Sequence, residues 1–297
     1  MLLFYADQGG KILGAEASFF NIRTQTLPKN DDAPLPPQGP IKKSDTSELD
    51  LNCASAVVLD LETGKILFDK DAEKESSIAS ITKLMTALVF LDHNPGWETI
   101  YEMRAEDKRE GGKIHLFMGE KVRVKDLFYT SLVASDNVAA IGLINSTGLS
   151  LEEFIMKMNE KAAEIGLAKT SFKDPLGLND NNVSNALEIA KLANKALLRD
   201  EIRNAAMTKM YEFKTQQGRA KVIYNTDDLL SVFPENGIEI KGGKTGYTEA
   251  AGYCFVGKFG NDGNEIISVV LNGESKNARF DQTHTLVKWV YDSYVWN

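Results

Sequence analysis

The order in which strand and helix patterns follow one another limits this chain to few folds. Apolar runs at residues 54–60 and 65–68, joined by a turn at 61–64, predict a β-hairpin. Strand patterns return in the last third of the chain, at residues 211–215, 238–241, 253–259 and 266–271. Helix patterns fill the interval. We therefore predict an α/β (α+β) protein: an antiparallel sheet assembled from both chain ends, flanked by helices, with a helical lobe inserted.

Helical periodicity is clearest in the middle of the chain and at its end. A buried-helix pattern covers residues 78–91, with Ser76 and Ser77 as candidate caps. Ser150 and Glu153 have the spacing of a capping box, in which each side chain bonds the other residue's backbone N–H. The predicted helices span residues 78–91, 124–144, 150–165, 184–198 and 278–294.

The first 49 residues differ in composition from the rest. Five of the eight prolines lie between residues 28 and 40, in a polar stretch that cannot bury enough apolar surface to offset its ordering entropy. We expect residues 1–49 to be an N-terminal segment with a disordered Pro-rich linker, and residues 50–297 to be the folded domain. Residues 15–17 resemble a small-x-small cleavage site, but residues 7–11 interrupt the apolar core of a secretory signal, so no export signal is evident.

Composition excludes several classes of protein. No apolar run approaches the roughly 20 residues of a membrane-spanning helix. A net charge of −8, from 34 basic and 42 acidic residues, argues against a nucleic-acid partner, which would need clustered Lys and Arg. Cys53 and Cys254 cannot build a disulfide framework or a four-sulfur zinc site, and we expect two small buried residues rather than a pair. With three histidines and no HExxH motif, we expect no metal.

Ser80 and Lys83 form the SxxK motif of this sequence, within the predicted helix 78–91. Residues three apart share one helix face, with Cβ atoms about 5–6 Å apart. A serine hydroxyl needs a base to become a nucleophile, and an uncharged lysine amine one turn away serves if burial lowers its pKa. The alternative is an exposed Ser and Lys on a surface helix. Since apolar neighbours bury almost the whole helix, the pattern favours a nucleophile and its base.

Ser135, Asp136 and Asn137 follow the apolar run 127–134. All three residue types favour turns, so a simple turn is one interpretation. The functional interpretation makes Ser135 a hydroxyl relay beside Lys83 and Asn137 a hydrogen-bonding partner of a substrate amide. The triplet by itself leaves both interpretations open.

A glycine-rich run at residues 241–248 reads KGGKTGYT. It is not a phosphate-binding loop, because five residues instead of four separate Gly237 from Gly243, and a strand pattern follows. Glycines here allow a ligand to approach the backbone of an edge strand. Lys244 adds a fixed positive charge and Thr245 a hydroxyl, a combination suited to a carboxylate.

The three motifs occur in the order SxxK, SDN and KTG, the set found in class A β-lactamases and penicillin-binding proteins. The sequence KTGYTEAAGYC, residues 244–254, closely resembles the low-molecular-mass D-alanyl-D-alanine carboxypeptidases. SITKLMTA at 80–87, DPLGL at 174–178 and NTDDLL at 225–230 are similar to further landmarks of that family. The resemblance covers residues 50–297, and it implies a β-lactamase/transpeptidase-like catalytic domain.

The resemblance also implies roles for the catalytic residues of a serine-type D-Ala-D-Ala carboxypeptidase without a cofactor. Ser80 would attack the carbonyl of the terminal D-Ala-D-Ala bond and become acylated, with Lys83 as general base. Ser135 would pass the proton to the leaving D-alanine. The backbone N–H groups of Ser80 and Tyr247 would form the oxyanion hole.

Other residues are expected to bind the substrate. The resemblance implies that Asn137 contacts the substrate backbone, whereas Lys244 and Thr245 hold the terminal carboxylate. The expected substrate-binding residues are Asn137, Lys244, Thr245, Gly246 and Tyr247.

The expected partners are peptidoglycan stem peptides and, as inhibitors, β-lactam antibiotics. We expect a monomer that acts outside the cytoplasm, in the periplasm or at the outer face of the cytoplasmic membrane. Many of these carboxypeptidases carry a C-terminal β-rich domain and an amphipathic membrane anchor. Because the sequence stops at Asn297, just after the predicted closing helix, we expect any membrane tether at the N-terminal end.

Other functions of the same fold predict different sequence features. A β-lactamase needs a deacylating Glu in an ExxxN-type loop between the second and third motifs, and residues 172–179 contain none. A non-catalytic peptidoglycan- or β-lactam-sensing module would be expected to lose Ser80 or Lys83. A DD-endopeptidase that cleaves cross-links would use the same nucleophile. A Ser-His-Asp protease is disfavoured, because no GxSxG motif is present.

Overall fold

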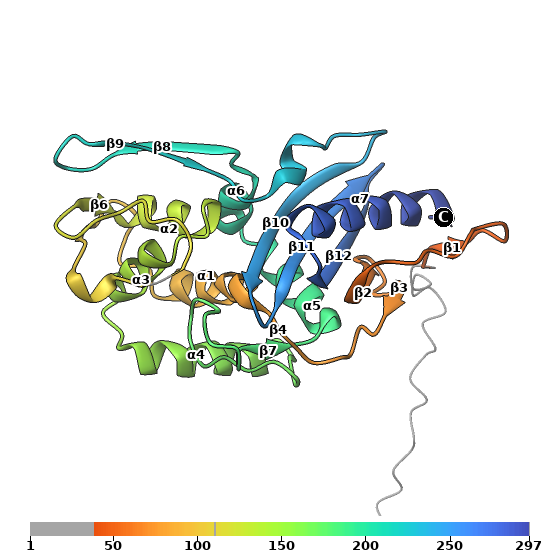
Figure 1. The fold of residues 1–297 in the computed structure, drawn as a ribbon, viewed down its shortest axis with the longest axis horizontal. Helices are drawn as coiled ribbons and strands as arrows, with labels where there is room; N and C mark the ends of the chain where they lie inside the picture. Colours follow the sequence, from red (N-terminus) through yellow and green to blue (C-terminus); the bar gives the residue numbers. More distant parts are fainter. Residues whose placement is uncertain (1–38, 110, 297) are drawn as a thin grey trace, which may run out of the picture. The chain divides into compact units, whose positions relative to one another are not determined.

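Both ends of the chain supply strands to one five-stranded sheet in the computed structural model, which describes residues 39–109 and 111–296 (Figure 1). The strands are β2 (Cys53–Asp60), β3 (Ile66–Lys70), β10 (Glu239–Thr248), β11 (Gly252–Asn261) and β12 (Asn264–Gly273). Their order is β10-β11-β12-β2-β3, and every neighbouring pair is antiparallel. The predicted sheet from both chain ends is confirmed.

A helix covers each face of this sheet. Alternate side chains of a strand point to opposite faces, so Val57 and Val58 of β2 belong to different hydrophobic clusters. Val57 packs in the cluster that contains α5 (Ala186–Leu197), and Val58 in the cluster that contains α7 (Lys276–Ser293). Both valines are fully buried, so the middle of β2 is covered on both faces of the sheet.

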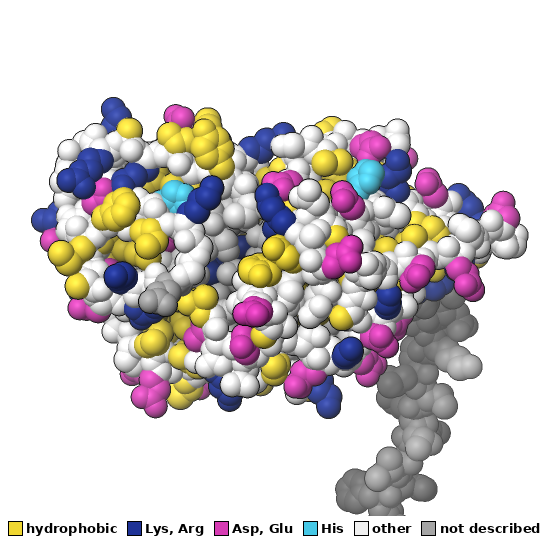
Figure 2. Space-filling model, in the orientation of Figure 1, with side chains coloured by type: hydrophobic (Ala, Val, Ile, Leu, Met, Phe, Trp, Pro, Cys, Tyr) yellow, Lys and Arg dark blue, Asp and Glu magenta, His cyan; other side chains and the backbone are white. Residues whose placement is uncertain are grey.

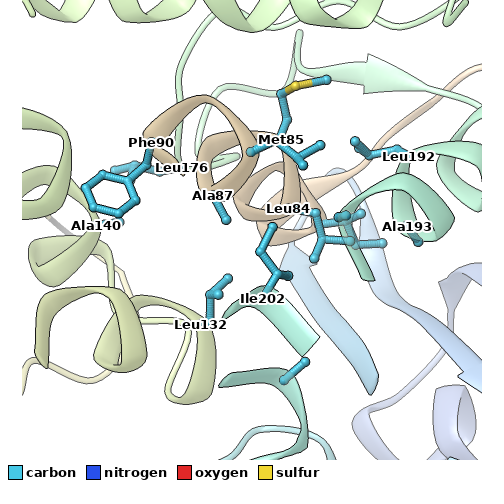
Figure 3. Packing of buried hydrophobic residues seen from close by; sticks show 14 of the residues in the cluster. Leu84, Met85, Ala87, Phe90, Leu132, Ala140, Leu176, Leu192, Ala193 and Ile202 are labelled. Carbon is cyan, nitrogen blue, oxygen red and sulfur yellow. The ribbon is translucent and has the colours of Figure 1, made fainter. Parts of the chain in front are cut away.

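The other helices form the lobe inserted between the two groups of strands. They are α1 (Lys83–Asp92), α2 (Val124–Val133), α3 (Asn137–Ser146), α4 (Leu151–Glu164) and α6 (Asp200–Met207). Helix α1 contacts α2, α3, α4 and α5, and its residues 83–90 are all buried. Figure 3 shows Leu84, Ala87, Leu132 and Ile202 among the side chains of this core. A helix buried on every side is a rigid support for the residues at its first turn.

The first predicted helix begins differently from expectation. Residues 79–82 form a 3-10 turn, η1 (Ala79–Thr82), ahead of α1. Ser76 and Ser77 do not cap it: they form the short strand β4 (Ser76–Ser77), which pairs with β7 (Val183–Ser184). The capping prediction for these serines is therefore wrong, because strand pairing takes up this part of the backbone.

The predicted helix 124–144 is two helices, α2 and α3. Ser135 has a φ of 57°, in the left-handed region that interrupts a helix. Asp136 then caps α3 by accepting the N–H of Ala139 at 2.9 Å. The triplet at residues 135–137 is thus a turn at a helix junction, as one of its two interpretations expects. The capping box of Ser150 at the start of α4 is confirmed.

The lobe also contains short elements that the sequence does not predict in full. The strand expected at residues 211–215 lies in a separate hairpin outside the main sheet, β8 (Met210–Lys214) with β9 (Ala220–Tyr224). Helix α6 and strand β9 are not predicted from the sequence, although the buried residues of α6, Ile202, Ala205 and Ala206, have helical spacing. The remaining short elements are β5 (Ile100–Glu102), β6 (Lys121–Arg123), η2 (Ala105–Asp107) and η3 (Asp228–Ser231).

Part of the segment expected to be a linker packs against the folded unit. Strand β1 (Ile41–Lys42) pairs with β13 (Tyr294–Val295), and the Lys65 ammonium donates to the Pro40 carbonyl at 2.7 Å. Residues 1–38 of the expected segment, including the cleavage-site-like residues 15–17, lie outside the described residues. Within the described chain, no single helix is long and apolar enough to cross a membrane. Helices α3 and α4 together have the length and composition of a membrane span, but the pair is bent by 94°.

Candidate active site

Ser80 and Lys83 lie at the junction of η1 and α1, one turn apart. The Lys83 side chain is completely buried. Its Nζ donates to Ser80 Oγ at 2.9 Å, to Asn137 Oδ1 at 2.7 Å and to the Leu176 carbonyl at 3.1 Å. The structure therefore brings together the two side chains of the SxxK motif.

The environment of Lys83 favours its uncharged form. Burial lowers the pKa of Lys83 from 10.5 to about 7, although the nearby carboxylates of Asp136 and Asp174 oppose the shift. The oxygens that accept from Nζ belong to neutral groups, which stabilise an ammonium less than a carboxylate in direct contact. At neutral pH a large share of this amine is able to accept a proton.

The DPLGL segment, residues 174–178, holds the turn that carries Ser80. A Cβ at Gly177 would lie 1.8 Å from the Ala79 carbonyl oxygen and 2.9 Å from the Ser80 backbone nitrogen. Gly177 also has a φ of 81°, which other residues rarely adopt. Only glycine fits this contact, so Gly177 sets how closely the segment approaches the nucleophile.

Asp174 fixes the same segment from within. Its carboxylate accepts the backbone N–H groups of residues 176–179 at 2.6–3.3 Å. As a result the Leu176 carbonyl, a neutral group, faces Lys83, while the carboxylate is directed at its own loop. This arrangement agrees with the sequence argument that residues 172–179 supply no deacylating glutamate.

The SDN turn connects the other two motifs. Asn137 Oδ1 accepts from Lys83, and Asn137 Nδ2 donates to the Gly111 carbonyl at 3.1 Å. Ser135 Oγ accepts from Lys244 Nζ at 2.8 Å. The hydrogen-bond partner that this turn gives Lys83 is thus Asn137, whereas Ser135, predicted as a relay beside Lys83, is bonded to the lysine of the third motif.

Lys244 and Thr245 lie on β10, an edge strand of the sheet, as the glycine pattern predicts. Lys244 is buried, and its Nζ also donates to the Thr245 carbonyl at 2.9 Å. Burial lowers the pKa of Lys244 well below its usual value; the charges of Lys83 and Arg279 add to this effect, and Asp227 opposes it.

Strand β10 also packs against the turn of the nucleophile. A Cβ at Gly246 would lie 2.9 Å from the Ile78 carbonyl oxygen and 3.3 Å from the Ser80 backbone nitrogen. Tyr247 follows Gly246 on the same strand, and its side chain is half exposed at the cleft. The backbone of residues 246–247 therefore runs beside Ser80, where two oxyanion-hole donors are expected.

Three further residues at the site are not among the predicted catalytic or substrate-binding residues. The buried Arg279 donates from Nη1 to the Gly246 carbonyl at 3.1 Å. Thr226 Oγ1 shares a hydrogen bond of 2.7 Å with Thr245 Oγ1. Asp227 is buried, and its Oδ2 has no partner among the described residues. Thr226 and Asp227 belong to the NTDDLL landmark, whereas Arg279 lies in the closing helix without a local motif.

A cleft of about 630 Å³ opens over these side chains, and Figure 2 shows the hollow at the centre of this face. Lys83 and Lys244 lie beneath its floor, bonded to side chains that line it. The arrangement joins a serine hydroxyl, an uncharged amine and a basic strand edge in one space. The predicted site residues that line the cleft are Ser80, Ser135, Asn137, Thr245, Gly246 and Tyr247.

Within the described ranges, no group of three or more His, Cys, Asp or Glu side chains could hold a metal ion. Cys53 and Cys254 are both buried and free.

The sequence matches the family described as Peptidase S11, D-alanyl-D-alanine carboxypeptidase, over residues 42–275. The chain belongs to this family. Membership confirms the resemblance that the three motifs indicate, and with it the predicted enzyme class, a hydrolase of the D-Ala-D-Ala carboxypeptidase type. Peptidase S11 enzymes are penicillin-binding proteins of the bacterial cell wall that act outside the cytoplasm.

Relatives of known name agree with this assignment. The D-alanyl-D-alanine carboxypeptidase DacF of Bacillus subtilis is 31% identical over 257 residues, which are 84% of this chain and 64% of that protein. The D-alanyl-D-alanine endopeptidase of Haemophilus influenzae is 32% identical over 230 residues, 76% of this chain and 77% of that protein. The crystal structure of the Streptomyces K15 DD-transpeptidase has a TM-score of 0.77 at 28% identity, covering 83% of this chain and 100% of that one. The transpeptidase-like fold is confirmed.

Proposed function

We propose that this chain trims the terminal D-alanine from peptidoglycan stem pentapeptides through an acyl-enzyme on Ser80. One observation carries the proposal: the buried Lys83 amine, with a pKa lowered to about 7, lies 2.9 Å from Ser80 Oγ. A serine hydroxyl gains reactivity from an adjacent base, and a base with a pKa near the working pH is efficient.

In the first step Ser80 Oγ bonds to the carbonyl carbon of the D-Ala-D-Ala bond, and its proton moves to Lys83. The C–N bond then breaks, and Ser135, which lies between the cleft and Lys244, gives a proton to the leaving nitrogen. The proton that Lys83 holds restores Ser135, so the Ser80 proton ends on free D-alanine. In the second step a water molecule adds its hydroxyl to the acyl carbon, the ester bond between this carbon and Ser80 Oγ breaks, and the other proton of the water goes to Ser80 Oγ.

The basic strand edge selects the substrate terminus. We assign the terminal carboxylate to Lys244 and Thr245, with Asn137 on the peptide backbone. The buried Arg279 adds a positive charge on the same side, beside the Gly246 carbonyl. The N–H groups of Ser80 and Tyr247 stabilise the oxyanion, and a donor of this kind contributes about 3–4 kcal/mol to transition-state binding.

A DD-endopeptidase is the second candidate. Relatives from three organisms that carry the name D-alanyl-D-alanine endopeptidase are 28–32% identical to this chain. Cleavage of a cross-link uses the same nucleophile and differs in the size of the leaving group. A pentapeptide and a cross-linked dimer, assayed side by side, separate the two activities.

We place the enzyme in the periplasm or at the outer face of the cytoplasmic membrane, as a monomer, with any membrane tether in the N-terminal segment that precedes the described residues. The substrate supports this placement, since stem peptides are found there. Sedimentation of the full chain tests the oligomeric state, and fractionation of the producing cells tests the compartment.

The proposed function is tested by D-alanine release from a pentapeptide ending in D-Ala-D-Ala. We expect release by the unmodified protein, none by Ser80→Ala, and unchanged release by Ser44→Ala, a matched change at an exposed serine outside the site. Undiminished release by Ser80→Ala refutes the assignment. A fluorescent penicillin identifies the alternatives: fast turnover of the label means a β-lactamase, and no label means a non-catalytic module.

A further inference from the structure

The wall of the cleft that faces β10 carries a histidine held by a buried carboxylate. His115 donates its backbone N–H to Asp136 Oδ2 at 2.9 Å, and its ring Nδ1 lies 2.9 Å from the same oxygen. The Asp136 side chain is completely buried and also caps α3. Both oxygens of this carboxyl group accept hydrogen bonds, from the backbone N–H of Ala139 and of His115, so we assign Nδ1 as the donor in the contact with the ring.

This contact leaves the other ring nitrogen, Nε2, for a further partner. His115 lines the cleft, and its side chain is 20% exposed. Among residues 39–109 and 111–296, Nε2 has no hydrogen-bond partner, whereas Nδ1 is engaged by Asp136. The hydrogen bond at Nδ1 thus fixes the orientation of the ring and leaves Nε2 for a ligand. Functional histidines are commonly oriented by a carboxylate in this way.

The chain segment that carries His115 is anchored at three points. Asn137 Nδ2 donates to the Gly111 carbonyl, Asp136 accepts from His115, and Lys221 Nζ donates to the His115 carbonyl at 2.8 Å. Two of these anchors are residues of the SDN motif, so the segment is fixed relative to the nucleophile. A site held in this way loses little entropy when a ligand binds.

Lys113 adds a positive charge to the same wall. It lines the cleft two residues before His115, and it is exposed. Within the described ranges no carboxylate lies at ion-pair distance from Lys113, whereas Lys276, which also lines the cleft, is paired with Asp228 at 3.0 Å. Basic side chains thus outnumber acidic ones among the residues that line the cleft, although the net charge of the protein is −8.

We propose that Lys113 and the imidazolium form of His115, in which Nε2 also carries a proton, form a second anion subsite, which binds a carboxylate that the stem peptide carries upstream of its D-Ala-D-Ala end. The terminal carboxylate is already assigned to Lys244 and Thr245 on β10. Lys113 and His115 are therefore suited to a second anionic group of the same substrate. This inference rests on the proposed function, because it names a further feature of the same substrate.

The test compares pentapeptides that differ in one carboxylate. One pair has a γ-linked D-glutamate at the second position with its α-carboxylate free or amidated, and the other has diaminopimelate at the third position, free or amidated. We expect the unmodified protein to prefer the free acid of at least one pair by about tenfold in kcat/KM, the effect of a charge-assisted hydrogen bond. Lys113→Met should reduce this preference to about threefold, and Lys191→Met, a matched change at an exposed lysine of α5, should leave it intact.

His115→Asn gives a second, independent readout. Asparagine keeps an amide near the position of Nδ1 and so preserves the bond to Asp136, but it removes the group at Nε2. We expect Lys113→Met and His115→Asn together to abolish the preference. Labelling by a fluorescent penicillin shows whether Ser80 of each variant can still be acylated. If His115→Asn is not labelled, the test rests on the preference measured for Lys113→Met.

Failure of this inference is distinguishable from failure of the proposed function. If the protein releases D-alanine but treats free and amidated peptides of both pairs alike, the subsite is refuted and the proposed function stands. If the protein releases no D-alanine, the Ser80→Ala protein still serves to measure peptide binding directly. Tighter binding of the free acid that Lys113→Met weakens supports the subsite, and equal binding of both forms overturns it.

Discussion

Replacing Lys83 by methionine tests whether the buried amine is uncharged in the folded protein. Methionine has a similar length and no charge, and the site of Lys83 is completely buried. Lowering the pKa from 10.5 to about 7 means that burial of the amine opposes folding by about 5 kcal/mol below pH 7. The substitution removes this unfavourable contribution, but it also removes the hydrogen bonds that Lys83 donates to Asn137 Oδ1 and to the Leu176 carbonyl, at about 1–3 kcal/mol each.

These two contributions nearly cancel near pH 6, so the decisive quantity is the pH dependence. Between pH 7 and 10.5 the unfolded chain holds the Lys83 proton and the folded protein does not. The free energy of unfolding of the unmodified protein therefore rises by about 1.4 kcal/mol per pH unit from this group. Lys83→Met lacks this rise, so the variant should lose about 3 kcal/mol relative to the unmodified protein between pH 7 and pH 9.5.

The measurement is urea unfolding of both proteins at several pH values from 6 to 9.5. Taking the difference between the two proteins cancels every other titrating group that they share. Lys191→Met, an exposed lysine on α5, is the control and should follow the unmodified protein throughout. Parallel curves for Lys83→Met and the unmodified protein would show that Lys83 stays protonated, and would refute the role of the uncharged amine.

Three further predictions concern the site. Acylation by a β-lactam should speed up as pH rises through about 7, because Lys83 must lose its proton; stopped-flow rates that stay flat from pH 5.5 to 8.5 contradict this. Lys244→Ala should lower kcat/KM about 10- to 100-fold for peptides with a free C-terminal carboxylate and much less for amidated ones, and an equal loss for both refutes the carboxylate role. Gly177→Ala should destabilise the fold by more than about 3 kcal/mol in urea unfolding, since its Cβ would collide with the Ala79 carbonyl; a variant of normal stability argues against that close contact.

The sequence predicts those parts of the site whose residues are close in the chain. Ser80 and Lys83 are three residues apart, so helical geometry alone brings them together. The edge position of β10 follows from its glycines and from the strand pattern after it. The sheet itself is predictable because hydrophobic patterning fixes the order of strands and helices.

Contacts between distant segments are beyond this kind of prediction. Ser135 bonds Lys244, 109 residues away, and that pairing depends on how the lobe sits against the sheet. The Leu176 carbonyl that faces Lys83 is a backbone group, so residue type does not reveal it. His115 has no motif around it, and its function emerges only from its bonds to Asp136, which the sequence presents as part of a turn.

The most direct test of the central claim locates the covalent bond to a β-lactam. The protein is incubated with benzylpenicillin, quenched, digested and mapped by mass spectrometry. We predict one adduct, on the peptide that contains Ser80, and none in the Ser80→Ala protein. An adduct on another residue, or equal labelling of Ser80→Ala, would contradict the claim that this hydroxyl is the nucleophile of the cleft.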